Sequence, residues 1–196
     1  WFSGVPGADI SVDSGALAAP RKVWNGGGMT VPVIFGLDGD RLTQTPVTAD
    51  DAAFAAIKTN VINIEERPLA AGEDPLENFN GRSAEIKATV DNPSRASVSF
   101  KVNERTVGDR HYYTEIGWNS ADGYFVSREH SEDGGINQGN YYKKFVSGVG
   151  REDAVLEFYI LIDRNAVEVF CGGGAAPFYL ITFASPYSTG ASFTAS

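Results

Sequence analysis

Acidic and basic side chains near an aromatic ring could bind a sugar at two places in this chain. Glu66 and Arg67 follow a short apolar stretch that predicts a strand, and Asp163 and Arg164 lie between two apolar runs. Carboxylate and guanidinium groups form paired hydrogen bonds with vicinal hydroxyls, and an aromatic face packs against a sugar ring. With Trp118 as that ring, we expect these residues to form a sugar-binding site.

The same residues also have a structural interpretation. Asp163 can cap a turn through its side-chain oxygen, and Arg164 can pair with a carboxylate that holds the turn. Trp118 lies in an alternating run, where an aromatic ring more often belongs to the core. Glu168 stands between two valines, so we expect it to face solvent or Arg164. Both interpretations stay open at the level of sequence.

Residues that could carry out catalysis show no recognisable pattern. His111 and His130 are the only histidines, and no Gly-X-Ser-X-Gly sequence presents a nucleophile. Asp122 and Glu132 lack the spacing of a metal-binding loop. Cys171 is the only cysteine, so no intrachain disulfide forms, and we expect a small buried thiol. We therefore expect no catalytic residues, no metal and no cofactor.

Short strands must position these residues. Apolar and polar residues alternate over four stretches, 84–90, 96–102, 156–162 and 166–170. Further strand candidates are 112–118, 123–128, 141–146 and 178–183. Short strands separated by turn residues predict an all-β, antiparallel β-sandwich of the lectin-like jelly-roll type over residues 60–196. A linker helix is expected over residues 48–59, because Thr48 can cap it and alanine favours its interior.

One of these strand pairs also carries a family resemblance. Ile162-Asp-Arg-Asn-Ala-Val-Glu-Val-Phe170 closely resembles a signature of family 32 glycoside hydrolases, the invertases, inulinases and levanases. In that family the signature lies in the C-terminal β-sandwich. Gln44-Thr-Pro46 and Phe125-Val-Ser-Arg128 fall in the family's order. The resemblance implies that residues 1–47 are similar to the exit from the catalytic propeller, although Val33 replaces the usual arginine.

The resemblance does not extend to the family's catalytic motifs. These are a Trp-Met-Asn-Asp-Pro-Asn-Gly sequence, an Arg-Asp-Pro sequence and a Glu-Cys sequence, and none occurs in this chain. Glu73-Asp74-Pro75 is similar to the second but lacks its arginine, and we expect it in a solvated loop. Glycoside hydrolysis needs two carboxyl groups across the scissile bond. We therefore expect that this chain is not an enzyme.

The resemblance leads to three functional hypotheses. Family 32 sandwiches are similar to modules that bind a terminal fructose with acidic residues and an arginine. The first hypothesis is a non-catalytic, lectin-like protein that binds fructans or other β-fructosides. The alternative is a C-terminal piece of a β-fructofuranosidase that stabilises the propeller, shapes the active-site rim or mediates dimerisation. The third is a secreted protein that reuses the fold for protein or host recognition.

The charge of the chain limits its partners. The formal net charge is −9, which argues against binding to nucleic acids or anionic membranes, because both require basic patches. No apolar run approaches the length of a membrane span. A neutral polysaccharide fits this charge. We expect a secreted protein that binds carbohydrate and that forms a homodimer or associates with a propeller domain.

Overall fold

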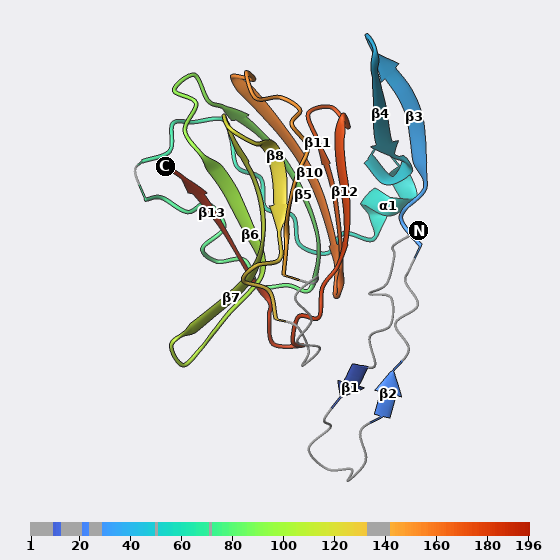
Figure 1. Cartoon of the computed structure of the whole chain (residues 1–196), viewed down its shortest axis with the longest axis vertical. Coiled ribbons are helices and arrows are strands. Elements are labelled where there is room, and N and C mark those ends of the chain that lie inside the picture. Colours follow the sequence, from blue (N-terminus) through green and yellow to red (C-terminus); the bar gives the residue numbers. More distant parts are fainter. Residues whose placement is uncertain (1–9, 13–20, 24–28, 50, 71, 133–141) are drawn as a thin grey trace.

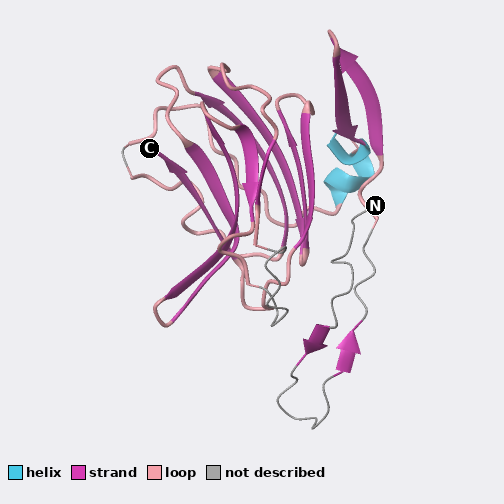
Figure 2. Ribbon diagram, viewed as in Figure 1, coloured by secondary structure: helices cyan, strands magenta, loops and turns pink. Residues whose placement is uncertain are grey.

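The computed structural model describes residues 10–12, 21–23, 29–49, 51–70, 72–132 and 142–196. Most of these residues form a sandwich of two antiparallel sheets, which face each other in Figures 1 and 2. One sheet has the strand order β13-β6-β7-β8-β9, and the other has the order β12-β11-β10-β5. The predicted all-β sandwich is therefore confirmed. Among the described residues, no helix is long and apolar enough to cross a membrane.

The strands predicted between residues 84 and 183 are present, with some changes at their ends. The five-stranded sheet consists of β6 (Val98–Val107), β7 (Arg110–Asn119), β8 (Gly123–Ser127), β9 (Lys144–Val146) and β13 (Gly190–Ala195). The four-stranded sheet consists of β5 (Ser83–Asp91), β10 (Val155–Asp163), β11 (Ala166–Cys171) and β12 (Ala176–Ile181). The sequence did not predict β13, and β9 has three residues where a strand over residues 141–146 is expected, of which residue 141 lies outside the described residues.

The core lies between the two sheets and follows the period of two in the strands. Every second residue of β10 points inward, so Leu156, Phe158 and Ile160 are buried. They meet the inward residues of the five-stranded sheet, where the Phe100 and Phe158 rings pack edge to face with centroids 5.1 Å apart. The remaining inward residues include Val98, Val102, Ile116, Trp118, Tyr124, Val126, Val167, Val169 and Phe193.

The family signature forms the hairpin between β10 and β11. Asp163 pairs with Ala166, so Arg164 and Asn165 make a two-residue turn. Arg164 adopts a left-handed backbone conformation with φ of 54°. Its N–H donates to the Arg82 carbonyl at 2.7 Å, and this bond ties the turn to the entry of β5. The predicted strand–turn–strand arrangement is confirmed.

A bulge interrupts the pairing of β6 with β7. The register shifts between Val102 and Arg105, and Asn103 takes a positive φ of 52° within the bulge. The buried Asn103 amide donates to the Thr182 hydroxyl at 3.2 Å, which links the bulge to the chain after β12. Bulges bend a strand and redirect its side chains. The bulge thereby directs Arg105 toward the loops at one end of the sandwich.

The segment before the sandwich contains a hairpin and a short helix. β3 (Val33–Asp38) pairs with β4 (Arg41–Pro46), and this two-stranded sheet stands beside β12 in Figure 1. A 3₁₀ turn (η1, Val47–Ala49) and the helix α1 (Ala52–Ala56) follow. Further toward the N-terminus, β1 (Ile10–Val12) pairs with β2 (Arg21–Val23).

Two expectations about the linker are wrong. The helix has five residues instead of the predicted twelve, and Asp51 caps it by accepting a hydrogen bond from the Phe54 N–H at 2.7 Å. Thr48 instead shares a hydrogen bond with the Tyr159 hydroxyl at 3.2 Å. The apolar stretch from Val61 to Ile64 is not a strand but an exposed loop, because no neighbouring strand pairs with it.

Candidate functional site: a charged cluster and an apolar hairpin

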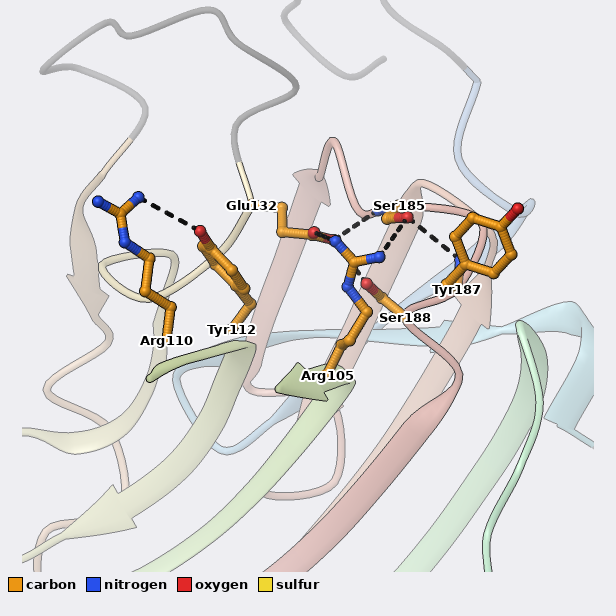
Figure 3. Close-up of polar contacts among 7 residues, drawn as sticks. All are labelled: Arg105, Arg110, Tyr112, Glu132, Ser185, Tyr187 and Ser188. Carbon is orange, nitrogen blue, oxygen red and sulfur yellow. Dashed lines mark hydrogen bonds and ion pairs between the residues drawn. The ribbon is translucent and has the colours of Figure 1, made fainter. Parts of the chain in front are cut away.

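A charged cluster joins three segments at one end of the sandwich (Figure 3). We call it the arginine cluster and define it as Arg105, Glu132, Ser185, Tyr187 and Ser188. Arg105 lies just after the β6 bulge, and Glu132 lies in the loop that follows β8. The other three residues belong to the connection between β12 and β13.

Glu132 is the centre of the arginine cluster. Its side chain pairs with Arg105 and accepts hydrogen bonds from the Ser185 N–H at 2.6 Å and the Ser188 hydroxyl at 2.5 Å. The Glu132 side chain is 12% exposed. A nearly buried carboxylate is stable when charged and neutral donors surround it in this way. Glu132 therefore fixes both Arg105 and the loop before β13.

Arg105 retains hydrogen-bonding capacity beyond these contacts. A guanidinium has five N–H groups, and Arg105 donates to Glu132 and to the Ser185 hydroxyl, the latter at 3.0 Å. Its Nε is buried and has no hydrogen-bond partner. A buried donor without a partner calls for an acceptor such as a water molecule or a ligand.

Tyr187 presents an exposed aromatic ring on the loop that Ser185 joins to Arg105. The residue is 77% exposed, and Figure 3 shows its ring directed away from Ser185 and Arg105. Its backbone is nevertheless fixed, since the Tyr187 N–H donates to the Ser185 hydroxyl at 3.3 Å. Figure 3 also shows a contact outside the arginine cluster, in which Arg110 on β7 donates to the Tyr112 hydroxyl at 3.5 Å. The arginine cluster thus combines an exposed ring, a charged fork and hydroxyl groups.

Trp118 cannot serve as the predicted sugar platform in this structure. Its side chain has no exposed surface, and its indole N–H donates to the Gly150 carbonyl at 2.7 Å. Neither face of the ring is open to a ligand. Trp118 is a core residue, which is the alternative that the alternating pattern also allowed.

The four charged residues of the predicted sugar site lie in two separate places. Glu66 and Arg67 are in the exposed loop after α1, and Asp163 and Arg164 are at the β10–β11 turn. No hydrogen bond or ion pair joins the two pairs in the part of the chain that the structure describes. Asp163 accepts a hydrogen bond from the Ser83 hydroxyl at 3.0 Å, so it does support the turn.

Arg67 takes part in a small charged pocket. It pairs with Glu73, and this contact lowers the pKa of Glu73 to about 2. The two residues line an open pocket together with Gly72, Asp74, Pro75, Glu77 and Asn78. Asp74 faces the sandwich, because its carboxylate accepts the Phe193 N–H at 2.9 Å. The contact of Glu73 with Arg67 thus stabilises the loop, and the contact of Asp74 with Phe193 attaches the loop to the sandwich.

The outer face of the four-stranded sheet is covered by the N-terminal segment. Glu168 is buried there, and its two carboxylate oxygens lie 3.1 and 3.2 Å from the Val31 nitrogen, which donates to them. Burial raises the pKa of Glu168, and the Val31 N–H opposes that rise. The expectation that Glu168 faces solvent or Arg164 is therefore wrong, because another segment packs over its side of β11.

Further contacts attach β4 to this face. The Tyr179 hydroxyl donates to the Gln44 side-chain oxygen at 2.5 Å, and the Gln44 N–H donates to the Gly174 carbonyl at 3.0 Å. A side chain at Gly174 would come within 2.4 Å of the Gln44 carbonyl oxygen. Gly174 also has a φ of 88°, so both its backbone and its lack of a side chain permit this close approach.

The far part of the same hairpin exposes apolar side chains. Phe35 is 63% exposed, Leu37 75% and Leu42 55%. The register pairs Phe35 with Gln44 and Leu37 with Leu42, so these residues share the face that carries Gln44. That face packs on the sandwich at Gln44 and is uncovered toward the hairpin tip. We call Phe35, Leu37 and Leu42 the apolar hairpin face.

Chemistry for catalysis is not evident among the described residues. None of them form a group of three or more His, Cys, Asp or Glu side chains that could hold a metal ion. Cys171 is buried, as expected, and burial raises the pKa of its thiol well above the ordinary value. A protonated thiol inside the core is a poor nucleophile.

The chain matches known proteins in one family. The family model described as Glycosyl hydrolases family 32 C terminal matches residues 54–196. No curated protein matches. Among solved structures, exo-inulinase from Aspergillus awamori is similar with a TM-score of 0.68 and 18% identity, over 86% of this chain and 33% of that chain.

Two other solved structures show the same fold. Sucrose-6-phosphate hydrolase from Lactobacillus gasseri has a TM-score of 0.59 and 19% identity, over 82% of this chain and 30% of that chain. Fructofuranosidase from Schwanniomyces occidentalis, in a complex with fructose, has a TM-score of 0.57 and 17% identity, over 83% of this chain and 36% of that chain. The chain therefore spans about a third of the length of these proteins.

Proposed function

The chain belongs to the C-terminal family of the family 32 glycosyl hydrolases, and we propose that it is the non-catalytic accessory sandwich of a glycosidase that acts on β-fructosides. In this proposal the sandwich holds a catalytic domain through its N-terminal hairpin. The catalytic domain is part of the same polypeptide or a separate chain. The single observation that carries the proposal is the apolar hairpin face.

The apolar hairpin face has the properties of a covered surface. A two-stranded hairpin alone in water is marginally stable. Here β3 and β4 form a sheet of their own, and three large apolar side chains on one face are more than half exposed. Exposed apolar clusters of this kind mark protein–protein contacts. The outer edge of β3 also presents backbone groups to which a further strand can add.

The similar solved structures support a catalytic domain as the partner. Exo-inulinase, sucrose-6-phosphate hydrolase and fructofuranosidase each contain a region similar to this chain and about two thirds of additional chain. The hairpin lies at the N-terminal side of the matched region, which begins at residue 54. A catalytic domain that precedes the sandwich would therefore meet the apolar hairpin face first.

Co-precipitation from the natural source tests this function. An antibody raised against the 196-residue chain should recover a polypeptide or complex about three times as large. The precipitate should hydrolyse sucrose or inulin, and a precipitate made with pre-immune serum should not. Recovery of the sandwich alone, without β-fructoside-hydrolysing activity, would contradict the proposal.

Carbohydrate binding is a second candidate function, and the arginine cluster favours it. Tyr187 offers an exposed ring on the loop that contacts Arg105 through Ser185, and an aromatic ring and a guanidinium are the kinds of groups that bind sugars. In this case the chain is a lectin-like protein for fructans or related β-fructosides. Secretion is part of this second proposal and rests on the family resemblance. Homodimerisation and protein or host recognition are further roles that the sequence suggests.

A binding screen with the isolated chain tests this second candidate. Levan and inulin immobilised in a native gel should slow the migration of the chain, and starch should not. Equal mobility in all three gels would contradict carbohydrate binding. The outcome has no bearing on the docking of a catalytic domain, which involves a different face.

A further inference from the structure

We propose that the arginine cluster binds two adjacent hydroxyl groups of a neutral sugar, with the Tyr187 ring stacked on that sugar. This inference rests on the second candidate function, carbohydrate binding, and assigns it to a site that sequence reasoning did not identify. The residues involved come from β6, from the loop after β8 and from the β12–β13 connection.

Arg105 supplies the donors for this site. The contacts with Glu132 and Ser185 fix the plane of its guanidinium, so a ligand would not have to order a flexible side chain. Its side chain is 26% exposed. Two N–H bonds go to protein acceptors, and the buried Nε–H has none. One N–H on each terminal nitrogen therefore remains for two neighbouring oxygens of a ligand, whereas the Nε–H lies inside the protein.

Tyr187 supplies the apolar contact. A tyrosine that is 77% exposed buries little area and contributes little to folding. Its backbone position is fixed all the same, because the Ser188 N–H donates to the Ser185 carbonyl at 2.9 Å. A tyrosine on a fixed backbone has only two side-chain torsions to order, so it loses little conformational entropy when a ligand covers its ring. The C–H face of a sugar ring matches such a surface.

The charge of the cluster selects a neutral ligand. Glu132 places a carboxylate directly against Arg105, and the whole chain has a net charge of −9. A phosphate or carboxylate ligand would gain from Arg105 but would be repelled by Glu132. A hydroxyl group both donates and accepts, so two adjacent hydroxyls can use Arg105 as donor and the partly exposed Glu132 carboxylate as acceptor. Sucrose should therefore bind more tightly than sucrose 6-phosphate.

Titration calorimetry on the full 196-residue chain tests the site, with levan oligosaccharides, sucrose and sucrose 6-phosphate as ligands. Tyr187→Ala should weaken levan binding about tenfold, and Tyr187→Phe should leave it within about twofold, because the ring remains. Arg105→Lys keeps the charge but loses the fork, so it should also weaken binding by about tenfold. Thermal unfolding of each variant controls for the fold, and exposed Tyr187 should tolerate both changes.

Arg67→Ala and Asp163→Ala are the matched controls, because they alter the residues expected from the sequence. If these two variants abolish levan binding while Tyr187→Ala and Arg105→Lys leave it unchanged, carbohydrate binding holds and the assignment to the arginine cluster is wrong. If the unaltered chain binds none of the sugars, both fail. Tighter binding of sucrose 6-phosphate than of sucrose would overturn the charge argument.

Discussion

Two glutamates, Glu132 and Glu168, each join the sandwich to a segment distant in sequence, but they do so by different means. Glu132 lies among an arginine, a hydroxyl and a backbone N–H, so several donors compensate its charge. Glu168 is buried on the outer face of the four-stranded sheet and accepts the Val31 N–H. Burial raises its pKa. Glu132 thus has several hydrogen-bond and ion-pair partners, whereas Glu168 is a buried carboxylate with one backbone donor.

The arginine cluster and the contact between the N-terminal hairpin and the sandwich are therefore stabilised by different interactions. The arginine cluster is a charge-compensated network on which a loop and Tyr187 depend. The hairpin contact relies on packing and a few neutral hydrogen bonds, with a carboxylate that is costly when ionised. A surface with few compensated charges is suited to being covered by a partner, whereas the arginine cluster is suited to meeting a polar ligand.

The largest expected effect comes from removing the Glu132 carboxylate. Glu132→Ala leaves Arg105 without its ion-pair partner and removes the acceptor of Ser185 and Ser188. The free energy of unfolding in urea should fall by about 3 kcal/mol. Ser188→Ala removes one of the donors and should cost about 1 kcal/mol. A loss below that of Ser188→Ala would show that Glu132 does not organise the loop.

A smaller, pH-dependent effect is expected at Glu168. A raised folded-state pKa means that the protonated carboxyl favours the folded chain below its unfolded pKa of about 4.3. That contribution is lost as the pH rises through the higher folded-state pKa. Glu168→Gln is neutral throughout, so its stability relative to the unaltered chain should improve between pH 4 and pH 7.

Urea unfolding at both pH values measures this difference, and Glu157→Gln, an exposed position on the neighbouring strand β10, is the matched control. A difference between Glu168→Gln and the unaltered chain that does not change with pH would contradict the contrast between the two glutamates.

The smallest effect is expected at an exposed pair of the same chemical type. Arg95 and Glu152 form an ion pair in which the Glu152 side chain is 80% exposed. Glu152→Ala should change the free energy of unfolding by less than about 0.5 kcal/mol, because solvent screens the pair. A loss comparable to that of Glu132→Ala would mean that burial does not account for the difference between the two arginine–glutamate pairs.

Much of the fold could be predicted from the sequence because it depends on local alternation. The strands of the β10–β11 hairpin show a clear period of two, and their turn residues lie at the expected place. Glu168 follows the same alternation and does point outward. The error about its exposure arose because alternation predicts which face a residue occupies, not whether a distant segment covers that face.

The arginine cluster could not be predicted in the same way. Arg105, Glu132 and Ser185 are far apart in the chain, and the β6 bulge that redirects Arg105 has no strong sequence signal. From the sequence, Glu132 is only an acidic residue that lacks the spacing of a metal-binding loop. Asn103 in the middle of an alternating strand was the available indication, since asparagine tolerates the left-handed backbone that a bulge can require.

Hydrogen exchange over Val33–Pro46 tests the docking proposal most directly. The experiment compares the isolated 196-residue chain with the polypeptide or complex that the antibody recovers from the natural source. If the apolar hairpin face holds a catalytic domain, the β3 and β4 amides should exchange rapidly in the isolated chain and be strongly protected in the native material. Equal exchange of these strands in both samples, with β10 and β11 protected in each, would contradict the account.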